Sequence, residues 1–131
     1  MDVRSVYEAL GIDFSDVLAL LRKEERIALY LEQTMCDPAF QALDEAMLRQ
    51  DWEAAFRAAH TIKGMALNLM LEPLAHAAID LVECLRGGTP DEREARELYD
   101  CLRTRIADIE RLMSCDAAEA AASPDESGAV L

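Results

Sequence analysis

The sequence predicts an all-α fold, an antiparallel four-helix bundle with short extra helices at its N-terminal end. Hydrophobic residues make up 52% of the chain but aromatic residues only 5%, a balance typical of long helices and not of sheets. The chain also has only five Gly and four Pro, which is little turn material for many short strands. Apolar residues recur at helical spacing along successive segments.

Two short helices are expected near the N-terminus. The first covers about residues 3–10 and stops at a glycine. Asp13 is placed to cap the second, whose apolar side lies within residues 14–21. A charged corner at residues 22–26 leads into a further segment of helical spacing over residues 27–35.

The next two helices begin at clear N-terminal signals. Asp37 followed by Pro38 combines an N-cap residue with proline at the first helical position, and predicts a helix to about Arg49. Asp51 is expected to cap a helix over residues 52–70. The apolar residues of that helix recur every three or four positions, as in a helix packed within a bundle: Trp52, Ala55, Ala59, Ile62, Ala66 and Leu69.

Sequence signals also indicate where the last two helices begin and end. Glu72 and Pro73 open a helix that should end at the glycine pair of residues 87–88. Thr89 and Glu92 then have the spacing of a capping box, with Thr89 as the N-cap, and the helix that follows is expected to end near Met113.

The helical pattern sets the expected domain organisation. Residues 1–113 should form one helical bundle domain, because 131 residues suffice for one sizeable core. Residues 114–131 show no apolar period and are expected to form a disordered, acidic and Ala-rich tail. The formal net charge of −13 argues against nucleic acid or an anionic membrane as a partner, since both favour a basic surface.

The cysteines and the N-terminus bear on the expected compartment. The four cysteines are widely spaced and form no CxxC pair. Residues 1–4 do not begin an apolar leader, and no apolar run of membrane-spanning length occurs. We therefore expect a cytoplasmic protein with reduced cysteines, and we expect it to be a monomer.

Few residues are available for chemistry. The chain has two histidines, so a metal site built on imidazole is not expected. Phosphate-binding glycine loops and common hydrolase motifs do not occur, and we expect no enzyme. Of the two histidines, His76 is interpreted as an exposed helix residue.

The other histidine, His60, has an unusual setting. Helical geometry at 100° per residue turns it away from the apolar seam and toward solvent. Lys63 and Gly64 follow on the next turn. Glycine within a helix costs about 0.5–1 kcal/mol relative to alanine, so Gly64 requires an explanation.

One mechanism explains this setting. Neutral imidazole is a nucleophile near pH 7, and attack on phosphorus needs space for a bulky donor, which a residue without a Cβ would leave. Lys63 would supply positive charge to the phosphoryl oxygens. Alternatively, Gly64 permits close packing of two helices.

The face around His60 also carries candidate docking residues. Large apolar side chains lie on it, at Phe56, Leu67 and Leu71, and they either receive a partner or are covered by the short N-terminal helices. Arg57 would help to dock a partner or would pair with Glu53 four residues earlier.

Residues 58–64, Ala-Ala-His-Thr-Ile-Lys-Gly, followed by Asn68 and Leu69, resemble the H-x-x-K-G signature of histidine phosphotransfer (HPt) domains. The preceding residues 51–55 are similar to the usual start of that helix, and the resemblance covers about residues 5–112.

The resemblance implies a role for each residue of the signature. His60 would be the phosphoacceptor, Lys63 would stabilise the charge of the phosphoryl group, and Gly64 would give steric clearance. Met70 departs from the family, because many members have glycine there, and this puts the geometry of the helix exit in question.

The function implied is that of a histidine-containing phosphotransfer protein in a two-component phosphorelay. It would exchange a phosphoryl group with the aspartate of a response-regulator receiver domain, and a hybrid histidine kinase is a further possible partner. The receiver would bring its own Mg²⁺, and no cofactor is expected on this chain.

The alternative is a non-phosphorylated helical adaptor that binds a receiver or kinase through the same face. A kinase fragment would need a nucleotide-binding motif, which does not occur.

Overall fold

The structure, a computed structural model, describes residues 1–122, with side chains described as far as Ser114. Within this range the regular structure is entirely helical, which confirms the predicted fold class. The helices are α1 (Val3–Ala9), α2 (Phe14–Leu21), α3 (Glu24–Met35), α4 (Pro38–Arg49), α5 (Trp52–Asn68), α6 (Glu72–Leu85) and α7 (Glu92–Ala122).

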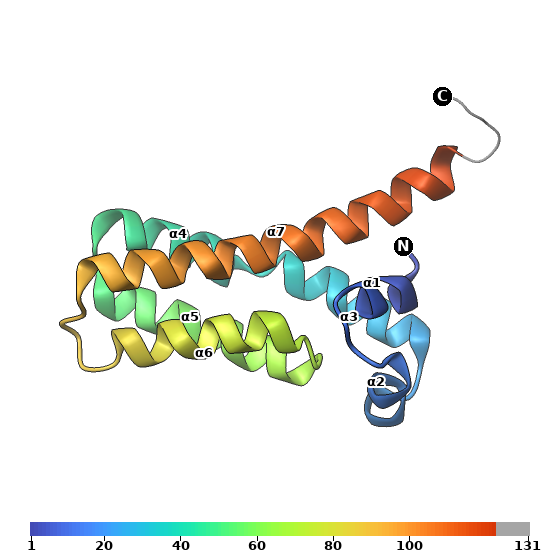
Figure 1. Cartoon of the computed structure of the whole chain (residues 1–131), viewed down its shortest axis with the longest axis horizontal. Coiled ribbons are helices and arrows are strands. Elements are labelled where there is room, and N and C mark those ends of the chain that lie inside the picture. The colour runs from blue at the N-terminus through green and yellow to red at the C-terminus, as the bar shows by residue number, and fades with distance from the viewer. Residues whose placement is uncertain (123–131) are drawn as a thin grey trace.

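Helices α4, α5, α6 and α7 lie side by side as a bundle, and successive helices run in opposite directions (Figure 1). α5 packs against both α4 and α6, and α6 packs against α7. Polar side chains join α7 to α4, because the Tyr99 hydroxyl donates to Asp44 Oδ1 over 2.5 Å and the Arg103 guanidinium pairs with the same carboxylate at 3.6 Å. Loss of solvent, together with the hydrogen bond to Asp44, raises the pKa of Tyr99 to about 12.

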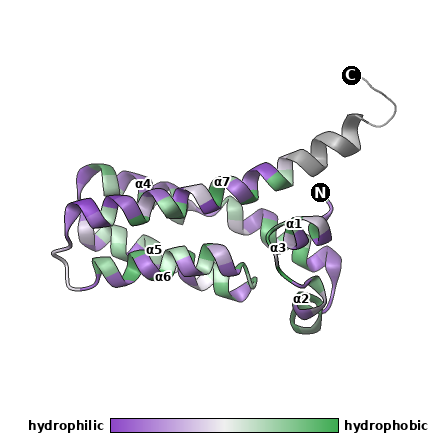
Figure 2. Cartoon of the chain, in the orientation of Figure 1, coloured by the Kyte–Doolittle hydropathy of each residue, from purple (hydrophilic) through white to green (hydrophobic). Residues whose placement is uncertain are grey.

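Each helix of the bundle is apolar on one side and polar on the other, as the mixed colours along each ribbon in Figure 2 show. The apolar seam predicted for α5 lies in the core: Ala55, Ala59, Ile62, Ala66 and Leu69 are buried, and Trp52 is partly buried against them. Facing residues of α6 complete this core, among them Leu74, Ala78, Leu81 and Leu85.

Three of the predicted N-caps are confirmed. The side chain of Asp13 accepts a hydrogen bond from the Ser15 amide, and Asp37 accepts one from the Ala39 amide over 2.8 Å. Asp51 begins α5 in the same way, since its carboxylate accepts from the amide of Ala54 over 3.2 Å. These carboxylates satisfy amides that have no partner within the first turn of a helix.

The predicted start of α7 is wrong. Thr89 is not the N-cap; instead the carboxylate of Asp91 accepts from the Arg93 amide over 3.0 Å, and the helix begins at Glu92. Aspartate and threonine both serve as N-caps, and the later start leaves residues 86–91 to make the reversal between α6 and α7.

The predicted end of α7 is also corrected. The helix continues past Met113 to Ala122. This stretch consists mainly of alanine, which has the highest helix propensity, and no glycine or proline interrupts it. The rest of the predicted tail, residues 123–131, lies outside the described residues.

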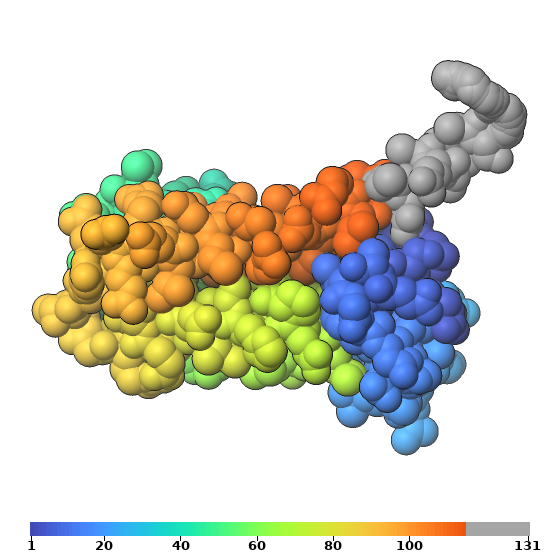
Figure 3. Space-filling view, viewed as in Figure 1, coloured from blue at the N-terminus to red at the C-terminus, as the bar shows by residue number. Residues whose placement is uncertain are grey.

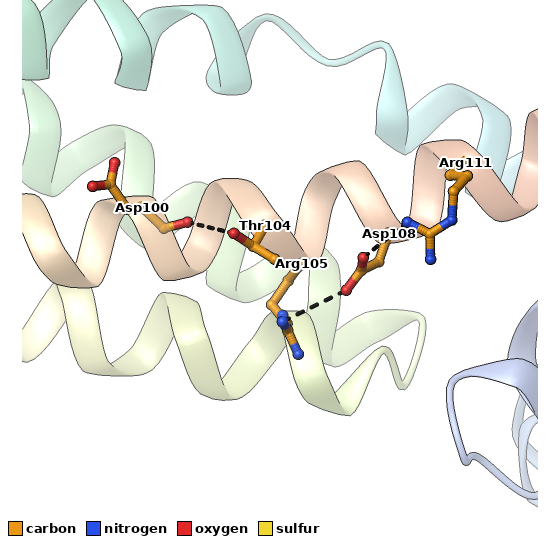
Figure 4. A network of polar contacts seen from close by, with 5 residues as sticks. All are labelled: Asp100, Thr104, Arg105, Asp108 and Arg111. Carbon is orange, nitrogen blue, oxygen red and sulfur yellow. Dashed lines mark hydrogen bonds and ion pairs between the residues drawn. The ribbon is translucent and has the colours of Figure 1, made fainter.

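Ion pairs on the surface of α7 run along its own axis. The Asp108 carboxylate accepts from Arg111 at 3.2 Å and pairs with Arg105 at 3.6 Å, and Thr104 donates to the Asp100 carbonyl oxygen (Figure 4). Pairs three residues apart on a solvated helix add little stability each.

The N-terminal helices lie at one end of the bundle, where the N-terminal segment packs beside α7 and next to the start of α6 (Figure 3). Tyr7 of α1 is fully buried and its ring lies 5.6 Å from that of Phe14, centroid to centroid. The Tyr7 hydroxyl donates a 2.6 Å hydrogen bond to the carbonyl oxygen of Leu69, directly after α5.

The exit of α5 differs from the prediction. The helix ends at Asn68, and Met70 has φ +55°, in the left-handed region. The Leu71 amide then donates to the Ala66 carbonyl oxygen over 2.9 Å, which closes the turn. A residue with a Cβ is disfavoured in this conformation by roughly 1–2 kcal/mol, which explains why glycine would suit the position.

Candidate functional site

The outer face of α5 holds the candidate site. His60 is exposed in the middle of this helix, on the side opposite the buried seam. This confirms the predicted orientation. The buried residues on either side of it, Ala59 and Ile62, anchor the helix in the core, so the imidazole is presented from a rigid support.

Gly64 has no role in packing within the described structure. A Cβ added at this position would meet no atom within 4 Å. This excludes the alternative that Gly64 allows two of these helices to approach closely. The space left by the absent side chain is therefore on the outer surface, one turn from His60.

Lys63 is half-buried on the turn after His60, in the helix that packs against α6. Its charge acts on Glu83 of α6: the hydrogen bond from Arg86, with the charges of Arg86 and Lys63, holds the pKa of Glu83 below its ordinary value.

The Phe56 ring contacts both the imidazole and a cation of α6. The Phe56 ring, one turn before His60, lies with its centroid 6.0 Å from that of the imidazole. The guanidinium carbon of Arg86 lies 5.6 Å from the same Phe56 centroid, within the range of a cation–π contact. Two hydrogen bonds, of 2.9 and 3.2 Å, join this guanidinium to Glu83.

The predicted docking residues separate into three groups. Leu67 is 52% exposed and Phe56 is half-buried beneath Arg86, so neither is covered by the N-terminal helices. Leu71 is fully buried, which corrects its assignment as a docking residue. Because α5 ends at Asn68, the chain turns before Leu71 and that side chain enters the core. Arg57 pairs with Glu53 at 3.3 Å, as the alternative interpretation proposed.

A shallow groove adjoins the same face. It lies between the C-terminal part of α5 and the α2–α3 hairpin, and it is lined by Leu21, Tyr30, Gln33, Thr34, Met65, Asn68 and Leu69. Together with exposed Leu67, the groove gives the surface beyond His60 an apolar character.

Two members of this arrangement were not found from the sequence. Glu83 and Arg86 are more than twenty positions from His60, and no motif connects them to it. Their place depends on the register of α6 against α5, which only the packed structure defines. The second histidine, His76, is exposed on α6, as predicted.

Among the residues that the structure describes, neither a metal-binding cluster nor a membrane-spanning helix is found. There, no group of three or more His, Cys, Asp or Glu side chains gathers so as to hold a metal ion. No helix among these residues combines the length and apolar character needed to cross a membrane.

An exposed histidine thus lies on a central helix of the bundle, and it is followed by lysine and by a glycine that the described fold does not need. The Hpt domain family model matches residues 28–122. The chain therefore belongs to the Hpt domain family. The match begins within α3, so α1 and α2 lie outside it, in contrast to the resemblance expected from about residue 5.

Members of this family are phosphocarrier modules of two-component signalling and interact with receiver domains and histidine kinases. Neither the curated proteins nor the solved structures gave a significant match to this chain.

Proposed function

We propose that this protein carries a phosphoryl group on His60 and exchanges it with the aspartate of a response-regulator receiver domain. The observation that supports this most strongly is Gly64. A residue that costs helix stability and leaves open space only on the outer surface, one turn from an exposed imidazole, suits the approach of a partner's phosphoryl group.

The proposed step is a direct transfer. The unprotonated ring nitrogen of His60 attacks the phosphorus of the receiver's aspartyl phosphate. A nitrogen–phosphorus bond forms as the oxygen–phosphorus bond breaks, and the electron pair of the broken bond stays on the carboxylate. The proton on the other ring nitrogen is retained. The reverse step returns the phosphoryl group to a receiver.

In this step Lys63 would stabilise the negative charge of the phosphoryl group. Phosphoryl transfer is accelerated mainly by positioning and by charge stabilisation, because the charge spreads over the equatorial oxygens. Lys63 lies on the turn after His60 and supplies a cation there, in a protein that is strongly acidic as a whole. The Mg²⁺ that assists the reaction would belong to the receiver.

The docking surface would extend from His60 along α5 toward the groove. Exposed Leu67 and the apolar lining residues Leu21, Tyr30 and Met65 would receive an apolar surface of the receiver. We propose that the protein works as a monomer in the cytoplasm, where it would meet both a receiver and a hybrid histidine kinase.

The test is phosphotransfer from radiolabelled, phosphorylated receiver domains of the same cell. Wild-type protein should acquire an acid-labile label, and His60→Gln should acquire none while its circular dichroism spectrum and melting temperature stay unchanged. The matched control is His76→Gln, because His76 is also an exposed helix histidine. That variant should be labelled like wild type.

Other outcomes would change the conclusion. Equal labelling of His60→Gln and wild type would exclude His60 as the acceptor. If no protein is labelled but a receiver still binds, and binds His60→Ala equally well, the chain is an adaptor. Labelling by ATP alone would point to a kinase, which the proposed carrier role does not predict.

A further inference from the structure

Two oppositely charged side chains of α6 pair beside the candidate site, an arrangement that phosphotransfer alone does not require. Glu83 accepts two hydrogen bonds from Arg86, and Lys63 lies close enough for its charge to act on the same carboxylate. The Arg86 head also lies over Phe56, whose other neighbour is the imidazole of His60. Glu83 thus pairs with a cation that lies over the ring next to the proposed phosphoacceptor.

We propose that Glu83 is the resting counter-ion of Arg86, and that it competes with the phosphoryl group on His60 for this cation. Arg86 is then a second cation of the site, which favours the phosphorylated state, while Glu83 opposes that state. This inference rests on the proposed function of His60 and concerns how readily His60 holds its phosphoryl group.

Charge and geometry both support the competition. A carboxylate and a phosphoryl group are both anions that accept hydrogen bonds from a guanidinium, and the phosphoryl group carries the larger negative charge. The Glu83–Arg86 pair is solvent-exposed, so it is weak and can be exchanged for another anion at little cost.

Arg86 has the reach for this exchange. It is the C-cap residue of α6 and is followed by Gly87 and Gly88, both with positive φ, so the chain around it is open. Its side chain is long and is held at the Phe56 ring, one aromatic residue away from His60. In the proposed exchange, the Arg86 side chain rotates from Glu83 toward an anion on His60.

The proposal predicts opposite effects from two neighbouring substitutions. Glu83→Gln should raise the fraction of protein phosphorylated at equilibrium with a receiver, by about two- to fivefold in the equilibrium constant, the scale of one exposed ion pair. Arg86→Gln should lower the same equilibrium constant by about two- to fivefold. Raising the salt concentration should reduce both effects, because the charges are exposed.

A small phosphodonor separates this effect from receiver binding. Phosphoramidate gives its phosphoryl group directly to imidazole: its nitrogen–phosphorus bond breaks, ammonia leaves, and the His60 nitrogen–phosphorus bond forms. With this donor the order of phosphorylation should remain Glu83→Gln above wild type above Arg86→Gln.

The pair Arg93–Glu97 provides charge-matched controls. It is an exposed ion pair of the same kind, at 3.5 Å, on α7 instead of α6. Glu97→Gln and Arg93→Gln change the net charge by the same amounts and should leave the equilibrium at the wild-type value. Equal effects of the α6 and α7 substitutions would show that net charge alone is responsible, and would overturn the proposal.

Two failures can be told apart. If wild-type protein is not phosphorylated at His60 by any donor, the proposed function itself fails. If wild type is phosphorylated but Glu83→Gln and Arg86→Gln match it, only the counter-ion proposal fails. Thermal melting of each variant verifies that the fold is retained.

Discussion

The hydroxyl of Tyr7 donates a 2.6 Å hydrogen bond to the carbonyl oxygen of Leu69, and this bond joins α1 to the exit of α5. The phenol is fully buried, and the turn that it contacts contains Met70 in the left-handed conformation. The N-terminal helices, although outside the matched Hpt region, are therefore part of the support of the helix that bears His60.

The first prediction concerns the strength of this contact. Tyr7→Phe removes the donor and leaves a buried carbonyl oxygen unsatisfied, so the free energy of unfolding should fall by about 1–3 kcal/mol. Urea denaturation measures the change. Tyr30→Phe is the matched control, because Tyr30 is 41% exposed, and it should change stability by no more than about 0.5 kcal/mol. Equal stability of Tyr7→Phe and wild type would contradict the role assigned to the bond.

The second prediction concerns alkaline pH. Burial raises the pKa of Tyr7 above its ordinary value of 10.0. The unfolded chain therefore loses this proton at lower pH than the folded protein does, and the tyrosine's contribution to stability is lost as pH rises above about 10. The free energy of unfolding should fall more steeply with pH in wild type than in Tyr7→Phe, by up to about 1.4 kcal/mol per pH unit. Parallel curves between pH 9 and 12, roughly the range over which tyrosines titrate, would argue against this protonation difference.

The third prediction separates function from stability at Gly64. Alanine at this position meets no atom within 4 Å and favours the helix, so Gly64→Ala should raise the free energy of unfolding by about 0.5–1 kcal/mol. The added methyl group should nevertheless slow phosphotransfer from a receiver by about ten- to a hundredfold, because close approach to His60 is obstructed. Rapid-quench kinetics with a phosphorylated receiver measures the rate. An unchanged rate in the more stable variant would remove the steric argument for Gly64.

The fourth prediction tests the corrected cap of α7. Asp91→Ala should destabilise the protein by about 1 kcal/mol, since the Arg93 amide loses its acceptor. Thr89→Ala should lie within about 0.5 kcal/mol of wild type, because Thr89 does not cap this helix. Thermal unfolding of the two variants decides between the caps, and the reverse order would restore the capping box expected from the sequence.

The parts of the fold that could be predicted depend on interactions between residues that are close together in the chain. The aspartate caps at residues 13, 37 and 51 act on amides two or three positions away, and the seam of α5 follows from the period of one helix. Where two local signals compete, prediction is weaker. Thr89 and Asp91 are both good N-caps, and the choice between them depends on how far the chain must travel between α6 and α7.

The same distinction applies to the candidate site. His60, Lys63 and Gly64 lie on consecutive turns of one helix, so their common face follows from sequence spacing. Leu71 was misplaced because the helix ends three residues before it, at a turn stabilised by the distant Tyr7 hydroxyl. That contact joins residues far apart in the chain and has no local sequence signal.

The sequence by itself determined the helical class, most helix limits and the face of α5 that bears the histidine, because each depends on interactions within a few residues. Only the tertiary structure decided which apolar residues of that face stay exposed, and that Arg86, paired with Glu83, lies over the Phe56 ring next to His60. Those outcomes depend on how one helix packs against another, since the register of α6 on α5 sets which distant charges meet.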